Sequence, residues 1–125
     1  MIVDGSPFQL TPSWFALGII TPERLSVMRL EWDQGHDRNP EHYRWRAFLE
    51  FLRARQPLDH DLAMQLYALG EADPDHFMGS DMMAHVLRLP ECPAEILDAA
   101  AASDRPFLVR LANERRAAAK AKAVK

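Results

Sequence analysis

The chain has 125 residues, of which 48% are hydrophobic, and its formal net charge is −3. This length supports one domain with a real core, and no run approaches the ~20 apolar residues of a membrane span. The start, Met1 to Asp4, lacks the basic and apolar regions of a secretory signal, so we expect a soluble cytoplasmic protein. Cys92 is the single cysteine, which excludes an internal disulfide and a zinc ribbon.

The N-terminal third contains two similar helix starts. Residues 1–10 show no periodicity and predict an extended lead-in. Thr11-Pro12 and Thr21-Pro22 each place a hydroxyl before a proline, as helix N-termini favour. The first predicts a short turn that ends at Gly18, and the second predicts a helix that ends at Gly35 with an apolar stripe of Leu25, Met28 and Trp32. We expect Trp14 and Trp32 to be core anchors.

Asn39-Pro40 predicts the start of the most strongly patterned helix. Its expected core face comprises Tyr43, Ala47, Phe48, Phe51 and Leu52. Its arginines, together with one that matches Arg53 after a shift of 35 residues, are Arg44, Arg46, Arg53, Arg55 and Arg88. They are interpreted either as a solvated face partly paired with Glu50 or as a strip that binds a partner. Because Arg and Trp concentrate binding energy, the candidate partner-binding residues are Trp45, Arg46, Arg53 and Arg88.

The middle of the chain predicts a helical hairpin. Asp59 can cap a helix that is apolar over most of its circumference and that we expect to end at Gly70. Gly79-Ser80-Asp81 offers the next cap, which predicts a helix over 81–89, with His76 to Met78 as a loop or a short first turn. Pro90 to Pro93 predicts a stiff link.

The C-terminal part predicts a second hairpin and a basic end. One helix follows Pro93, and another follows a cap at Ser103 or Asp104. From Asp104 to the C-terminus, seven basic residues face two acidic ones, a net +5, so the first 103 residues carry −8. We expect a single domain over 1–114 and a frayed or disordered tail over 115–125. The tail either complements the helix dipole or forms a nucleic-acid arm, whose contacts would be Arg115, Arg116, Lys120 and Lys122.

The prolines have a regular spacing. Pro22, Pro57 and Pro93 are 35 and 36 residues apart, and Pro40, Pro74 and Pro106 are 34 and 32 apart. Periods of this size are typical of helical repeats. The alternative is that loops between similar helices are evenly spaced without any repeat.

The segment Cys92-Pro93-Ala94-Glu95-Ile96-Leu97, followed by Asp104-Arg105-Pro106-Phe107-Leu108-Val109-Arg110, resembles the HEAT and HEAT-like group, including variant leucine-rich repeats. Units of that group pair a proline-led helix with an Asp-Pro-type turn and a Val-Arg pair. The resemblance implies a stacked α-solenoid that binds other macromolecules. Asp73-Pro74 keeps the turn without the Val-Arg pair. The expected fold is therefore all-α, with two to three helical hairpins as a HEAT-like fragment or an irregular bundle.

The chemistry-bearing residues do not form a catalytic pattern. The best metal pattern, Asp81 with His85, lacks the histidine pair at helical spacing that a catalytic zinc site uses. Cys92 has no local base, and the glycines are scattered, so no phosphate loop is indicated. We expect no cofactor and no metal.

These patterns favour a non-enzymatic, accessory, adaptor or regulatory protein that binds another protein through a helical surface, with a homodimer as a further possibility. The alternatives are a nucleic-acid-associated regulator that uses the basic end and a small metal-dependent enzyme such as a hydrolase. We expect no membrane contact.

Overall fold

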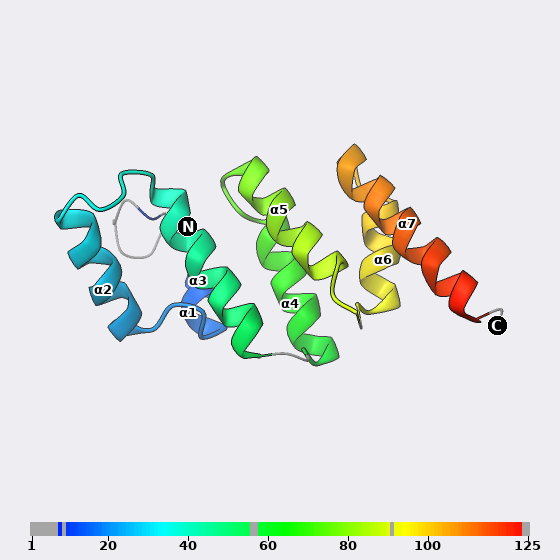
Figure 1. Ribbon diagram of the computed structural model, residues 1–125, viewed down its shortest axis with the longest axis horizontal. Coiled ribbons are helices and arrows are strands. Elements are labelled where there is room, and N and C mark those ends of the chain that lie inside the picture. Colours follow the sequence, from blue (N-terminus) through cyan, green and yellow to red (C-terminus); the bar gives the residue numbers. More distant parts are fainter. Residues whose placement is uncertain (1–7, 9, 56–57, 91, 124–125) are drawn as a thin grey trace. The chain divides into compact units, whose positions relative to one another are not determined.

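The computed structural model describes residues 8, 10–55, 58–90 and 92–123, with side chains as far as Lys120. Within these ranges the chain forms seven α-helices and no strand (Figure 1). The all-α prediction is confirmed. No helix in the described part of the chain is long and apolar enough to cross a membrane. Pro57, a member of the proline series, and most of the lead-in lie outside the described residues.

The chain forms two compact units, residues 1–56 and 57–125. We call them unit 1 and unit 2. Each has its own buried side chains.

Unit 1 contains three helices, α1 (Pro12–Ala16), α2 (Pro22–Asp33) and α3 (Pro40–Ala54). The Thr21 hydroxyl accepts a hydrogen bond from the Arg24 N–H at 3.2 Å, and the Asn39 side chain accepts one from the Glu41 N–H at 3.1 Å. The predicted helix starts at Thr21 and Asn39 are confirmed, whereas the Thr11 side chain makes no capping hydrogen bond, so that predicted cap is wrong. The chain leaves α1 and α2 through glycines with φ of 80° and 73°, conformations that favour residues without a Cβ.

The core of unit 1 uses the predicted face of α3 together with aromatic rings from other segments. The buried residues of this face are Tyr43, Ala47, Phe48, Phe51 and Leu52, as predicted. The Phe8 ring lies 5.8 Å from Trp32 and 5.0 Å from Tyr43, in edge-on and tilted geometries that suit aromatic pairs. Trp14 is buried, as predicted, and Phe8 and Leu10 near the end of the lead-in also belong to the core.

Arg44 corrects the prediction of an arginine strip on α3. Its side chain is 1% exposed, and its guanidinium lies 5.9 Å from the centre of the Trp14 ring. The physical reason is its position one turn before Phe48 on the buried face of the helix. Arg44 is therefore a core residue, and α1 supplies the aromatic face that covers it.

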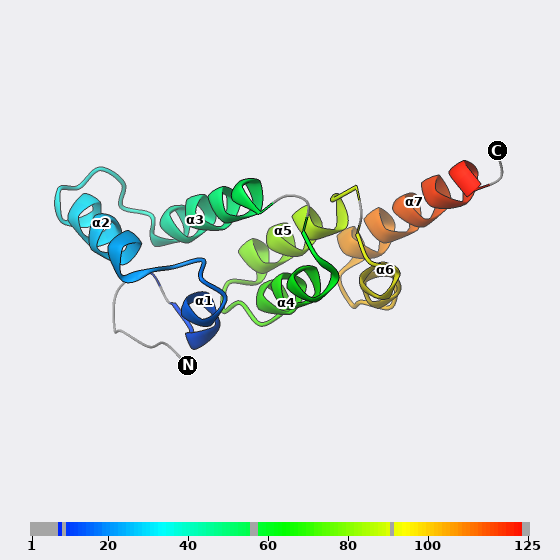
Figure 2. The ribbon, with the colours of Figure 1, turned by 90° about the horizontal axis from the view of Figure 1, so that it is seen from below.

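Unit 2 consists of two helical hairpins. Its helices are α4 (His60–Glu71), α5 (His76–Leu87), α6 (Ala94–Ala101) and α7 (Pro106–Ala123). Helix α4 packs on α5, α6 packs on α7, and α5 also packs against α7 (Figure 2). The Asp59 carboxylate accepts the Leu62 N–H at 2.7 Å, which confirms this cap. The basic segment continues α7 as far as Ala123.

The predicted boundary between α4 and α5 is wrong. Gly70 does not stop α4, which continues to Glu71, and Gly79 does not precede α5, which starts at His76 under a cap from Asp75. Both glycines are buried where the two helices meet, and a Cβ on Gly70 would lie 2.9 Å from the Gly79 carbonyl oxygen. The glycines serve close helix packing, which a local sequence pattern does not reveal.

Candidate functional site

Helices α2 and α3 of unit 1 form a groove of about 270 Å³, which we call the α2–α3 groove. Helix α2 positions four of its lining residues and α3 positions three. They are Arg24, Val27, Met28, Glu31, Tyr43, Arg46 and Glu50. The groove therefore combines two aliphatic side chains with charges of both signs.

Two aliphatic side chains on α2 are exposed: Val27 lines this groove, and Leu30 follows it on the adjacent face of the helix. Val27 is 54% exposed and Leu30 is 57% exposed. They lie three residues apart, so they are neighbours on one helix face. The packing stripe of α2 is less exposed, because Met28, which also lines the groove, is buried and Leu25 and Trp32 are half-buried.

Ion pairs fix the charged rim of the α2–α3 groove. Arg24 of α2 pairs with Glu50 of α3. The Arg46 guanidinium lies 4.8 Å from the centre of the Tyr43 ring, and its Nη1 is 3.4 Å from the Asp37 carboxylate. These contacts hold two cationic side chains at the groove before any partner arrives.

Asp37 organises the loop between α2 and α3. Its carboxylate accepts the Asn39 N–H at 2.9 Å and lies 2.8 Å from Nδ1 of His42, and its carbonyl accepts the Tyr43 hydroxyl at 2.8 Å. The backbone bond from Asn39, followed by the His42 side chain, lowers the pKa of Asp37 below its ordinary value. An ionised Asp37 thus orients Arg46 at the groove.

The predicted partner-binding residues are divided between the two units. Trp45 is half-buried, with its ring stacked on Phe48 at 6.0 Å, whereas Arg46 lines the groove and Arg53 is exposed near the end of α3. Arg88 follows α5 in unit 2, where its guanidinium lies 5.8 Å from the centre of the Phe107 ring. Arg46 is the member of this set that lines a groove.

The predicted nucleic-acid contacts all lie on α7. Arg115 donates to the Leu89 carbonyl at 2.8 Å, and Arg116 lies 3.6 Å from the Asp98 carboxylate. Lys120 is exposed, and the side chain of Lys122 lies outside the described residues. The two arginines therefore make contacts within unit 2, and nucleic-acid binding stays a prediction.

Within the described residues the candidates for chemistry form no metal-ligand group, and the Cys92 thiol has an unfavourable pKa. Among the residues that the structure describes, no three His, Cys, Asp or Glu side chains are grouped as metal ligands. Burial, followed by the charge of Arg88, lowers the pKa of His85, the residue that the sequence paired with Asp81. Burial also raises the pKa of the Cys92 thiol to about 11, which suppresses its nucleophilic thiolate.

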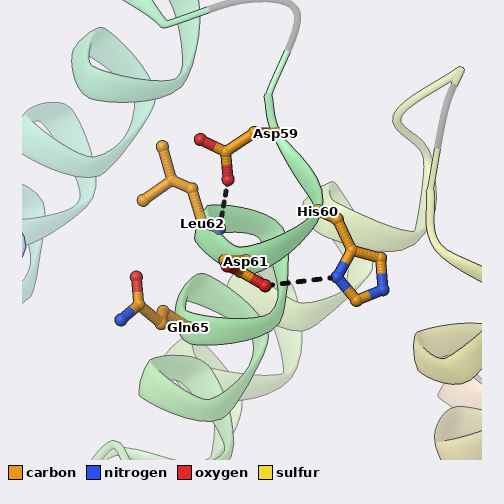
Figure 3. A pocket seen from close by; sticks show the side chains of 5 residues that line it. All are labelled: Asp59, His60, Asp61, Leu62 and Gln65. Carbon is orange, nitrogen blue, oxygen red and sulfur yellow. Dashed lines mark hydrogen bonds and ion pairs between the residues drawn. The ribbon is translucent and has the colours of Figure 1, made fainter.

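A shallow hollow lies at the start of α4, lined by Asp59, His60, Asp61, Leu62 and Gln65 (Figure 3). Its groups are engaged in local structure. Asp59 caps the helix, and the His60 ring lies 3.4 Å from Asp61 and 2.7 Å from Glu95 of α6. This arrangement ties the two hairpins of unit 2 together.

Val27 and Leu30 are functional candidates that the sequence prediction missed. The signal was present, since the predicted stripe of Leu25, Met28 and Trp32 leaves both side chains on the opposite side of α2. The groove itself depends on how α3 packs, which periodicity does not give.

No family model, curated protein or solved structure matches this chain.

Proposed function

We propose that this protein is an interaction module that binds another protein through the α2–α3 groove and the adjacent face of α2. The observation that carries the proposal is the exposure of Val27 and Leu30, both more than half exposed, beside a groove with preorganised charges. Covering them would remove apolar surface from water, at about 25 cal/mol per Å².

The groove has the layout of a small protein-binding surface. Binding energy concentrates at apolar or arginine-bearing anchors that a rim shields from water. Val27 supplies the exposed apolar anchor, with the buried Met28 beside it, and the pair of Arg24 with Glu50 supplies part of the rim. The rim carries both positive and negative side chains. It therefore favours a partner with a complementary arrangement of charges over a partner with a large net charge of one sign.

An amphipathic helix is the partner segment that suits this surface. Such a helix presents aliphatic side chains three or four residues apart, the spacing at which Val27 and Leu30 stand on α2. Its flanking acidic residue would face Arg46, and its basic residue would face Glu31. We expect an adaptor or regulatory role on this basis.

The test compares three forms of the full chain as baits in native cell extract. They are the unchanged protein, a variant with Val27→Glu and Leu30→Glu, and a control with Met64→Glu, an exposed apolar residue of unit 2. We expect a protein that the first and third forms retain and that the double variant retains at least about tenfold less. Equal retention by all three forms would overturn the proposal.

Salt separates this proposal from nucleic-acid binding by the basic end. Apolar anchoring should survive a rise from about 0.1 M to about 0.5 M salt, where exposed charges are screened. Deletion of residues 115–125 should leave retention of the partner unchanged. Loss of DNA or RNA retention upon that deletion would instead favour the nucleic-acid alternative.

A further inference from the structure

Phe77 is the most exposed large hydrophobic side chain that the structure describes, with 83% of its surface in solvent. It lies in the first turn of α5, where its ring stands 6.2 Å from that of His76. A phenylalanine gains free energy when its ring is covered. Phe77 is therefore a candidate contact for a second surface.

The surroundings of Phe77 are acidic. The carboxylates at this end of unit 2 belong to Glu71, Asp73, Asp75 and Asp81. Asp75 caps α5 through the Met78 N–H, whereas Glu71 and Asp81 are exposed. Asp81 lies one helical turn after Phe77, on the same face.

The side-chain hydrogen bonds of the nearby Arg105 do not involve the carboxylates of Glu71 or Asp81. Arg105 donates to the Ser80 hydroxyl at 3.0 Å, to the Met83 sulfur at 3.1 Å and to the Glu71 carbonyl at 3.4 Å. Its guanidinium is therefore directed into the seam between the helices. The exposed carboxylates of Glu71 and Asp81 therefore place negative charge near the Phe77 ring, where a cationic partner could bind.

The chain has its own basic end, but that end lies too far away. Arg105, just before α7, bonds to the first half of α5, whereas Arg115 of α7 bonds to Leu89, beyond the end of α5. Helix α7 thus runs in the same direction as α5. The 12 residues of α5 span about 18 Å, so the last turns of α7 are at the opposite end of unit 2 from Phe77.

Those last turns offer a small apolar surface with positive charge. Ala117, Ala118, Ala119 and Lys120 are all exposed. Alanine side chains let a helix approach an aromatic ring closely, and the lysine carries the charge opposite to that of the carboxylates near Phe77.

We infer that unit 2 associates head to tail with a second copy of the chain, in which residues 116–120 of one copy cover Phe77 of the other. Lys120 then lies against the carboxylates of Glu71 and Asp81. The two contacting surfaces differ, so the contact is heterologous, and each copy can extend the assembly. This contact does not depend on the α2–α3 groove.

Sedimentation of the purified full chain tests the inference. At low salt, the weight-average mass should rise above that of the monomer as concentration increases over ~5 to ~300 µM, a range suited to a weak contact. The variants Phe77→Ser and Lys120→Glu should each remain monomeric. A mixture of the two variants retains one intact contact, between Phe77 of one variant and the basic end of the other. The mixture should therefore form dimers and no larger species.

Two controls make each outcome decisive. Leu30→Ser removes an exposed aliphatic side chain from unit 1 and should associate like the unchanged chain, and circular dichroism checks that every variant is folded. A monomeric unchanged protein throughout the range would overturn the inference. Association that survives Phe77→Ser would also overturn it.

Discussion

Gly70 of α4 and Gly79 of α5 lie against each other where the two helices cross, and neither has room for a side chain. A Cβ on Gly70 would lie 2.9 Å from both the Gly79 oxygen and the Met83 Cγ, and a Cβ on Gly79 would overlap the Gly70 carbonyl. The obstacle to each substitution includes backbone, which cannot rotate away. This crossing sets how closely the first hairpin of unit 2 packs.

We expect Gly79→Ala to destabilise unit 2 by about 3 kcal/mol, because separation of α4 from α5 outweighs the roughly 1 kcal/mol that alanine gains in helix propensity. Hydrogen exchange resolved by peptide would show the loss in unit 2. Gln65→Ala, on the exposed side of α4, should leave the exchange of both units nearly unchanged. Equal stability of Gly79→Ala and the unchanged chain would refute the close crossing.

Asp59→Ala should lower the free energy of unfolding by about 1 kcal/mol, the usual worth of an N-cap. The carboxylate accepts the Leu62 N–H at 2.7 Å, and its removal leaves that donor without its cap. Urea unfolding measures the effect. The control is Asp61→Ala, whose side chain is 96% exposed, and a loss as large as that of Asp59→Ala would contradict the assigned cap.

Arg105→Ala should cost about 2 kcal/mol, in the range of hydrogen bonds to charged groups. It removes three contacts that join the start of α7 to α4 and α5. Faster hydrogen exchange over α7 would report the loss. Arg110→Ala, at an exposed position of α7, should remain within about 0.5 kcal/mol of the unchanged chain.

The pair of His60 and Glu95 should make the stability of unit 2 depend on pH. The hydrogen bond to Glu95, followed by that to Asp61, raises the pKa of His60 above 6.5, and a backbone bond, followed by His60, lowers the pKa of Glu95 below 4.5. The contribution of His60 to the free energy of unfolding is fully present below pH 6.5 and disappears as pH rises through the pKa of His60 in the folded protein. The Glu95 contribution is present above pH 4.5 and disappears as pH falls through its folded pKa.

The stabilisation is therefore greatest between about pH 4.5 and 6.5. The difference in unfolding free energy between the unchanged chain and His60→Ala should peak in this window and shrink above it. Histidine NMR titration provides a direct check, since His60 should titrate above its ordinary pKa. A normal or lowered His60 pKa would exclude the pair.

The starts of α2, α3 and α4 were predictable from sequence because their capping signals are local. Thr21, Asn39 and Asp59 each lie within three residues of the N–H group that they cap. The buried face of α3 was predictable for the same reason, since its spacing alone defines it. Arg44 occupies that face as well, and its position one turn before Phe48 would have identified it as buried.

Features that depend on contacts between helices were not predictable. Gly70 and Gly79 carry the local signature of helix ends, but their function depends on residues across the crossing. The α2–α3 groove likewise requires Arg24 and Glu50 to meet from separate helices. Periodicity defined each helix face, and packing determined which faces remained exposed.

A photo-crosslinking amino acid at position 30 tests the central claim most directly. The full chain with this residue in place of Leu30, irradiated in native cell extract, should form a covalent adduct with one protein, and Val27→Glu should abolish the adduct. The same residue in place of Arg53 or Met64 provides the comparison. Adducts from 53 or 64 but none from 30 would contradict binding at the α2–α3 groove.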